Sequence, residues 1–526
     1  MVGLVLAIAY LPIDKFWLSK EGVTQQPVTL VKPATPAAVP AATAISEKSV
    51  AVLPFLDMSE KKDQEYFSDG LSEELIDMLT KIQDLRVPAR TSSFYFKGKS
   101  EDIPTIGRRL MVAHVLEGSV RKYGNHLRVT AQLVRADSGY HLRSQTYDRN
   151  LDDIFKVQAD IAGSVVKALK ISIMKAEVPQ VAPTANSEAH MLYLRALSLA
   201  RLATSADSVQ AYKDLRRALS LDPEFALAWA ALAELLTDDS WGWGNVISPA
   251  GGPPAGQRDN NYAYWSGVRE QECQLAKDAA QRGLQLNSDL AETHLAMALA
   301  LYWVDWNWAA ANSELKKVRE LDPANAAATE AAAGLANTMG RFEEGLKLAA
   351  LALAQDPLGT AYWDIGAAKH RLGSLDEAAA AYQHLIELYP TGTAYHYRRA
   401  LVPLSKHDAQ AALDEMEREN TPWYRQAGMP LVLDALGRRA MGKGNLVEYI
   451  GIAVPYERRD QLLGVLLSLF GPYTRTAVNQ GTAAIYSWPI DNGIAMAVKA
   501  SANPTNGILE FGVARWSSAA KSVKAK

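Results

Sequence analysis

A recurring proline marks the part of the chain that most constrains its fold. Pro323, Pro357 and Pro390 follow apolar stretches of helical spacing, at intervals of 357 − 323 = 34 and 390 − 357 = 33 residues. Pro223 ends an earlier Leu-Asp-Pro, and Asn287-Ser288 is a version without proline. A small residue stands twelve positions before each of these marks: Ala211, Ala276, Ala311, Gly345 and Ala378. A period near 34 residues predicts a stack of two-helix units.

The unit that ends at Pro390 carries the fullest motif. It reads Tyr362-x2-Ile365-Gly366, then Gly373, Ala378-x3-Tyr382 and Pro390, and it resembles the tetratricopeptide repeat. Small residues let neighbouring helices approach closely, and proline ends the second helix because it cannot continue one. The resemblance covers residues 187–450, with a Gly/Pro-rich insertion near 237–260. It implies an all-α superhelix whose concave groove binds a protein or peptide.

Four residues are candidates for lining this groove. Glu330 and Asn337 are seven apart on the first helix of one expected hairpin, and Trp363 and His370 are seven apart on another. Seven residues make nearly two turns, so each pair shares a helix face, and the tetratricopeptide geometry implies that this face lines the groove. The alternative is that these residues only pack or are solvated. The tryptophans of residues 303–308 are expected to pack between helices.

Before the repeats, residues 47–175 predict a compact α/β domain. The apolar run Ser49–Phe55 is typical of a buried strand, and Asp69 and Ser72 are candidate N-caps of the helix that follows it. Later the apolar period changes from helical to two, with turn signals at Gly124-Asn125 and Asp137-Ser138-Gly139. The other expected elements are a strand at 86–96, a helix at 103–111, strands at 115–122, 126–135 and 140–148, and a helix at 151–170.

Several motifs of this domain occur together in order. They lie at residues 49–55, 65–76, 89–94, 115–121, 128–133 and 146–149, and together they resemble the TolB amino-terminal-like domain of bacterial signalling proteins. The resemblance implies a position after one membrane helix and before tetratricopeptide repeats, often with a winged-helix or nucleotide cyclase output domain upstream. We expect no output activity from this chain, which begins without such a domain. Arg143 stands where the family usually has tryptophan.

The first 46 residues predict a membrane anchor and a spacer. The uncharged run Val2–Ile13 would span about 18 Å as a helix, short of the roughly 30 Å hydrocarbon core. We therefore expect residues 1–20 to hold part of a transmembrane helix, with a buried or interfacial segment as the alternative, and residues 21–46 to form a Pro/Ala-rich linker. The TolB-like resemblance implies a bacterial inner-membrane protein with periplasmic domains. Lys15 and Lys20 follow the apolar run, however, and positive charges beside a membrane helix favour a cytoplasmic location for the residues after it.

Composition and motifs exclude several functions. The 55 Lys+Arg and 58 Asp+Glu residues leave a net charge of −3, so no nucleic-acid partner is expected. Cys273 is the only cysteine, which excludes an intramolecular disulfide and a multi-cysteine metal site. Phosphate-loop, zinc-protease and nucleophile-elbow motifs are absent, so we expect no catalytic residue, cofactor or metal. The arginines of residues 121–149 are expected on a solvated sheet face, and residues 451–526 as a diverged or irregular segment.

The sequence therefore predicts an α+β multidomain chain: a partial transmembrane helix, a TolB-like α/β domain and a tetratricopeptide superhelix. Its expected function is that of a membrane-tethered, non-enzymatic sensor or scaffold that binds a protein or peptide. The alternative is a cytosolic regulatory scaffold that works with a separate DNA-binding or cyclase partner. A hydrolase with a site between the α/β domain and the repeats is less well supported, since no nucleophile–base pair is evident.

Overall fold

The computed structural model describes residues 45–82, 84–150, 153–169, 184–201, 205–242, 247, 262–436, 454–455, 474–478, 483–490, 494–501 and 508–515. The expected anchor at residues 1–20 and nearly all of the linker lie outside these residues. The chain divides into two compact units, one of residues 40–402 and one of residues 403–526 with 1–39. Each unit is described by itself.

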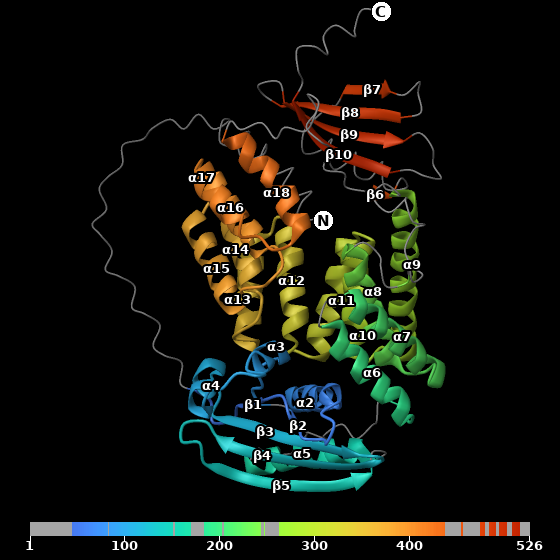
Figure 1. The fold of residues 1–526 in the computed structure, drawn as a ribbon, viewed down its shortest axis with the longest axis vertical. Coiled ribbons are helices and arrows are strands. Elements are labelled where there is room, and N and C mark those ends of the chain that lie inside the picture. The colour runs from blue at the N-terminus through green and yellow to red at the C-terminus, as the bar shows by residue number, and fades with distance from the viewer. Residues whose placement is uncertain are drawn as a thin grey trace, which may run out of the picture. The chain divides into compact units, whose positions relative to one another are not determined.

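The first unit begins with a mixed sheet (Figure 1). Its strands are β1 (Val50–Val52), β2 (Leu56–Asp57), β3 (His114–Tyr123), β4 (His126–Arg135) and β5 (His141–Asn150). The order is β1-β3-β4-β5, with β2 also pairing β3. Strands β1 and β2 run parallel to β3, whereas β3, β4 and β5 form an antiparallel meander. The three long strands confirm the period-two prediction, and β4 has the bounds expected from the sequence.

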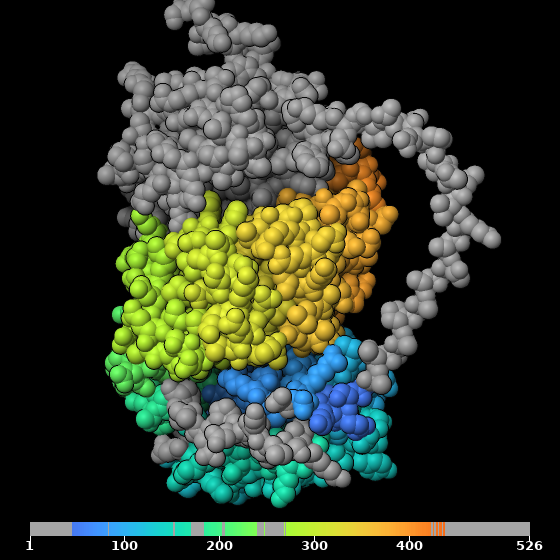
Figure 2. Space-filling view, turned by 180° about the vertical axis from the view of Figure 1, so that it is seen from behind, coloured from blue at the N-terminus to red at the C-terminus, as the bar shows by residue number. Residues whose placement is uncertain are grey.

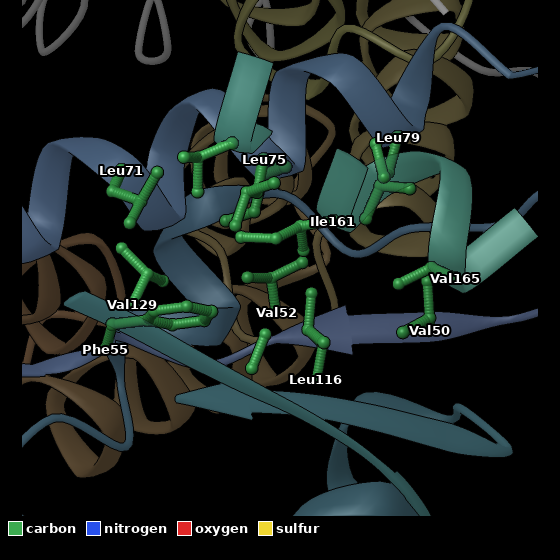
Figure 3. Close-up of a cluster of buried hydrophobic side chains, with 14 of the residues drawn as sticks. Val50, Val52, Phe55, Leu71, Leu75, Leu79, Leu116, Val129, Ile161 and Val165 are labelled. Carbon is green, nitrogen blue, oxygen red and sulfur yellow. The ribbon is translucent and has the colours of Figure 1, made fainter. Parts of the chain in front are cut away.

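Four helices accompany this sheet: α2 (Glu65–Thr80), α3 (Arg90–Phe94), α4 (Ile103–Leu110) and α5 (Ile154–Ala168). Side chains of α2 and α5 pack on one sheet face and bury Val50 and Val52 of β1 (Figure 3), whereas Ala51 is buried on the other side by a cluster that includes Phe96 and Leu110. Leu71 and Leu75 of α2 and Val129 of β4 are each 0% exposed. Fully burying such a side chain contributes roughly 1.5–3 kcal/mol, so this cluster is the main source of stability for the α/β domain.

The strand expected at residues 86–96 is wrong. Arg86 makes a single bridge to Ser49, and Arg90–Phe94 is the helix α3. Pro88 has no N–H group, so it cannot donate to a strand ladder. Ser92 then uses both its N–H and its hydroxyl in contacts with the repeats, and these long-range contacts stabilise the helical turn.

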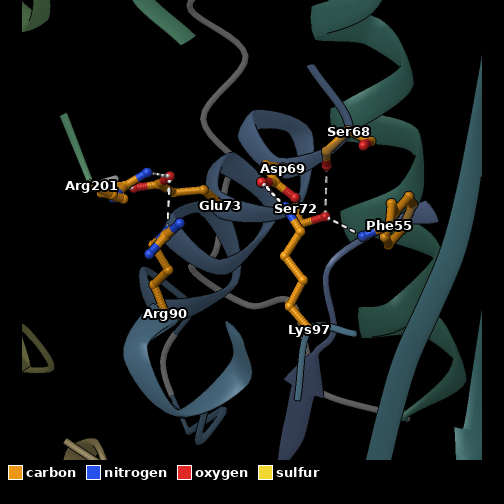
Figure 4. Close-up of polar contacts among 8 residues, drawn as sticks. All are labelled: Phe55, Ser68, Asp69, Ser72, Glu73, Arg90, Lys97 and Arg201. Atoms are coloured by element: carbon orange, nitrogen blue, oxygen red, sulfur yellow. Dashed lines mark hydrogen bonds and ion pairs between the residues drawn. The ribbon is translucent and has the colours of Figure 1, made fainter. Parts of the chain in front are cut away.

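The expected caps at Asp69 and Ser72 are also wrong, because α2 begins at Glu65 and both residues lie inside it. The Ser72 hydroxyl donates to the Ser68 carbonyl (2.8 Å) and accepts from the Phe55 N–H (2.8 Å) (Figure 4). Asp69 forms an ion pair with Lys97. Ser72 therefore bonds Phe55, and Asp69 pairs with Lys97. Both partners lie outside α2, and a local capping pattern cannot reveal them.

The remainder of the first unit consists of helical hairpins (Figure 1). The helices are α6 (Ser187–Ala200), α7 (Ser205–Leu221), α8 (Ala226–Gly242), α9 (Tyr262–Leu286), α10 (Ala291–Leu299), α11 (Trp308–Leu321), α12 (Ala326–Thr338), α13 (Phe342–Gln355), α14 (Tyr362–Arg371), α15 (Leu375–Leu388) and α16 (Tyr395–Ser405). A π-helical turn, η2 (Ala300–Val304), follows α10. Successive helices pack in pairs from α6·α7 to α14·α15.

The small residues of the repeat motif lie where the helices meet. Ala211, Ala276, Ala311 and Ala378 are each 0% exposed. At Gly345 an added Cβ would collide with the Asn337 side chain of the preceding helix. Helix α8 continues through Trp241, into the region expected as an insertion, and most of that insertion lies outside the described residues.

The second unit carries α17 (Ala409–Met416), α18 (Pro422–Ala435) and a sheet that the sequence analysis missed. Its strands are β6 (Val454–Pro455), β7 (Thr474–Val478), β8 (Ala483–Ile490), β9 (Ile494–Ser501) and β10 (Ile508–Arg515), in the antiparallel order β6-β10-β9-β8-β7. The sequence analysis expected a diverged or irregular segment over residues 451–526, and the part of it that the structure describes forms these strands. These strands are rich in alanine, which has little strand preference and obscures the alternation.

Candidate partner-binding groove

The candidate site lies on α12, α14 and α16, the first helices of three successive hairpins. Asn325 caps α12 by accepting from the Ala328 N–H (2.9 Å). Gly340 and Gly373 end α12 and α14 in left-handed conformations, with φ of 76° and 77°, which glycine adopts without steric cost. These turns reverse the chain, so α12, α14 and α16 follow one another along the array.

Trp363 of α14 is the centre of an aromatic and cationic cluster. The guanidinium of Arg398 on α16 lies over its ring, with 4.7 Å from Cζ to the ring centroid. The rings of Tyr395 and Tyr382 lie 6.0 Å and 6.4 Å from it. Trp363 is half-buried, so part of the indole remains accessible. A cation–π contact of this kind stabilises by about 0.5–2 kcal/mol and holds α16 against α14.

Glu330 and Asn337 of α12 both bond to residues beyond their own helix. Glu330 accepts a hydrogen bond from Thr360 Oγ1 (2.6 Å), and burial raises the pKa of its carboxyl. Asn337 Nδ2 donates to the Asp364 carbonyl (3.0 Å) and to Asp364 Oδ1 (3.3 Å). Burial raises the pKa of Asp364 well above its ordinary value, and the nearby Glu330 charge adds to the shift. These contacts join α12 to α14.

His370 lies away from the accessible surface. His370 is only 6% exposed, although it follows Trp363 by seven positions on the same helix. Burial, together with the charges of Arg371 and Arg398, lowers the pKa of His370 to about 4. The ring is therefore neutral near pH 7. Of the four expected groove residues, the structure places Glu330, Asn337 and Trp363 at partly accessible positions.

The surface around Trp363 combines aromatic and cationic side chains. Part of the Trp363 indole and the Arg398 guanidinium lie together at one surface, and tryptophan and arginine are enriched at protein interfaces. Among the described residues, no group of three or more His, Cys, Asp or Glu side chains could hold a metal ion.

The sequence analysis missed Asp364, Tyr395 and Arg398. Two of them carry a signal in the repeat period. Asp364 follows its proline by 364 − 357 = 7 residues, as Glu330 does by 330 − 323 = 7, and 395 − 362 = 33 places Tyr395 one repeat after Tyr362. Arg398 carries no such signal, because its role depends on how α16 packs against Trp363.

The α/β domain packs against the repeats along α6, through an ion pair from Lys81 to Glu292 of α10, and from the α13–α14 turn to Tyr389. Along α6, Leu194 joins the core of the α/β domain and lies 2.8 Å from a Cβ built on Gly70 of α2. On the same helix pair, Glu74 bonds His190. Glu73 pairs with both Arg90 and Arg201 (Figure 4). Helix α2 therefore covers α6, whereas Trp363 on α14 stays accessible.

Another contact is at the turn between α13 and α14. The Ser92 N–H donates to Asp356 Oδ1 (2.8 Å), and the Leu358 N–H donates to Ser92 Oγ (2.7 Å). The Ala89 N–H donates to the Gln355 carbonyl (3.1 Å). The blue α/β surface and the yellow repeat surface meet without a gap on the face shown in Figure 2. The Asp-Pro turn thus ends a helix and also docks the α/β domain.

In the part of the chain that the structure describes, no helix is both long and apolar enough to cross a bilayer.

No protein-family model matches the chain. A Rhizobium meliloti (strain 1021) protein named "Putative adenylate cyclase 3" is 32% identical over 290 residues, which are 55% of this chain and 45% of that protein. The chain thus spans less than half the length of this relative.

Solved structures similar to this chain are tetratricopeptide proteins. PilW, a type IV pilus biogenesis factor, is 17% identical with a TM-score of 0.35, over 48% of this chain and 100% of that one. YrrB, described as having an unusual peptide-binding site, is 16% identical with a TM-score of 0.28, over 42% and 97%. A repeat protein from Parabacteroides merdae is 14% identical with a TM-score of 0.33, over 54% and 99%. At these low scores, the repeat assignment rests on the hairpins of this chain.

Proposed function

We propose that this chain is a non-enzymatic scaffold that binds a protein or peptide partner on the surface of α12, α14 and α16. The observation that carries the proposal is the accessible indole of Trp363 beneath the Arg398 guanidinium. Aromatic and arginine side chains dominate binding energy at protein interfaces, because they bury large areas and bond directionally. Glu330 and Asn337, one helix earlier, position α14 for this contact through their bonds to Thr360 and Asp364.

A peptide selection tests this proposal while the partner is still unidentified. The purified full chain would be immobilised and exposed to a phage library of random twelve-residue peptides. The affinity of the best peptide would then be measured by fluorescence anisotropy against wild type, Arg398→Gln and Arg341→Gln. Arg341 is the matched control, since it is a half-buried arginine, like Arg398, pairs with Glu344 and lies outside the cluster.

The expected result is at least tenfold weaker binding to Arg398→Gln and unchanged binding to Arg341→Gln. Equal affinities for all three proteins would refute a groove at Trp363. Equal losses in both variants would show that the peptide responds only to net charge.

We further propose that the α/β domain is TolB-like and that the chain is tethered to the bacterial inner membrane, with its domains in the periplasm. The ordered motifs between residues 49 and 149 support the first statement, and the apolar run Val2–Ile13 supports the second. A reporter active only in the periplasm, fused after Lys175 with the native upstream coding region present, tests the orientation. A signal is expected, and a reporter active only in the cytoplasm would instead favour a cytosolic scaffold.

A second candidate function is that of a regulatory region associated with a nucleotide cyclase. The cyclase name of the Rhizobium meliloti relative favours it, because the match extends over 290 residues. Assaying the purified chain for cyclic AMP formation from ATP separates regulation from catalysis. We expect no product. Product formation that a matched inactive preparation lacks would overturn the non-enzymatic proposal.

A further inference from the structure

The sheet face that points away from the α/β core carries a cavity of about 320 Å³. Side chains alternate along β4, so Leu127 and Val129 enter the core while Arg128 and Thr130 lie on the opposite face. The cavity is lined by six residues of three strands: Ser119, Arg121, Arg128, Thr130, Thr146 and Asp148. None of these six residues belongs to the surface at Trp363 or to the contacts with the repeats described above.

The strand register arranges three of these residues as a row of hydroxyls. Ser119 of β3 pairs with Thr130 of β4, which pairs with Thr146 of β5. The Oγ1 atoms of Thr130 and Thr146 lie 3.3 Å apart. Each hydroxyl can donate one hydrogen bond and accept others, so the row suits a ligand that itself carries hydroxyl groups.

The other three residues form a row of charges beside the hydroxyls. Arg121 stands opposite Arg128, which stands opposite Asp148. Arg128 Nε donates to Asp148 Oδ2 (3.0 Å), so this pair is neutralised. Like charges directly across two strands are destabilising, and within the described residues no carboxylate pairs with Arg121. Two arginines and one aspartate give a charge of 2 − 1 = +1, which one negative charge would balance.

We propose that this cavity binds a small organic monoanion that carries one carboxylate and several hydroxyl groups, the chemical class of the sugar acids. The guanidinium of Arg121 binds the carboxylate through two parallel hydrogen bonds, a geometry that arginine matches and lysine does not. The hydroxyl row and Asp148 bond the ligand's own hydroxyls. The volume is at the lower end of the range for small-molecule sites. A dianion such as phosphate exceeds the available positive charge and meets the Asp148 carboxylate.

Isothermal titration calorimetry of the full chain with D-glucuronate tests the ligand class. D-glucose supplies the hydroxyls without the carboxylate, and acetate and sulfate supply negative charge without the hydroxyls. We expect glucuronate to bind at least tenfold more tightly than each of the other three. Absence of heat with glucuronate at millimolar concentration would overturn the proposal. Equal binding of acetate or sulfate would also overturn it, by leaving an adventitious ion only.

Two substitutions locate the binding. Arg121→Gln should weaken glucuronate binding at least tenfold, whereas Arg149→Gln should leave it unchanged. Arg149 is the matched control because it is exposed on β5 next to Asp148 but alternates to the other side of the strand. Equal losses in both variants would refute a specific site. Thr130→Val should weaken glucuronate and leave acetate unaffected, which tests the hydroxyl row, and circular dichroism of each variant checks that the fold is retained.

Discussion

Replacing Ser92 by alanine tests whether the α/β domain is held to the repeats by the contact at the α13–α14 turn. Ser92 is 0% exposed, and its hydroxyl oxygen accepts from the Leu358 N–H at 2.7 Å. Alanine leaves that buried amide without a partner, which costs about 1–3 kcal/mol. This cost corresponds to about a 5- to 150-fold change in an equilibrium constant. The variant should therefore open far more often at this turn.

Ser93 provides the matched control on the same helix. It is also 0% exposed, but its hydroxyl has no hydrogen-bond partner among the residues that the structure describes. Ser93→Ala should therefore leave stability unchanged or slightly raised, because the buried hydroxyl is removed without loss of a bond.

Hydrogen exchange measured by mass spectrometry, resolved to the Leu358 amide, compares the two variants with wild type. Faster exchange in Ser92→Ala alone is the expected result. The same exchange rate in Ser92→Ala and Ser93→Ala would refute the reasoning. It would mean that losing the hydroxyl bond of Ser92 has no effect on the Leu358 amide.

Three further predictions concern the repeats. Gly366→Ala places a Cβ 2.5 Å from the fully buried Tyr382 ring and should destabilise by about 1–3 kcal/mol in thermal unfolding, whereas Gly163→Ala, with nothing within 4 Å, should stabilise by about 0.5–1 kcal/mol. Equal effects of the two would contradict the steric argument. Tyr382→Phe removes a buried hydroxyl that has no partner in the described part of the chain, so the free energy of unfolding should stay the same or rise. A clear decrease in that free energy, measured by thermal unfolding, would show that the hydroxyl makes a stabilising bond. His370 has a pKa of about 4 when folded and about 6.5 when unfolded, so the unfolded chain binds more protons between these values and stability is lost as the pH falls through them. His370→Leu should reduce that loss by about 3 kcal/mol between pH 7.5 and pH 4 in urea unfolding, and an unchanged slope would count against it.

Much of the repeat array could be predicted because its determinants are local. The small residues twelve positions before each repeat proline or its equivalent are buried where two helices cross. Because that steric requirement arises within one repeat, a local motif reveals it. The antiparallel strands β3, β4 and β5 were predictable for the same reason, since alternation does not depend on distant residues. The turn glycines Gly124 and Gly139 adopt φ of 57° and 70°, as short turns require.

The misjudged residues depend on partners far away in the sequence. Ser92 reaches Asp356 and Leu358 across separations of 264 and 266 residues, so nothing nearby distinguishes its helix from a strand. His370 shares a helix with Trp363, but the packing of the neighbouring hairpins decides which of the two stays accessible. The site was therefore predictable as a region of α12 and α14, and its individual side chains were not.

The contacts of the α/β domain at α6 and at the α13–α14 turn restrict the flexibility of the repeat array. In a free array each repeat touches only its neighbours, so the coil can bend or stretch like a spring. Here Leu194 and Asp356, separated by 356 − 194 = 162 positions, are tied to the same rigid body. The α/β domain therefore bridges the repeats between Leu194 and Asp356 and fixes how the helices between these two points are arranged. The contact continues past Asp356, because Leu388 and Tyr389 pack in one cluster with Phe96 of the α/β domain, so α15 is held as well.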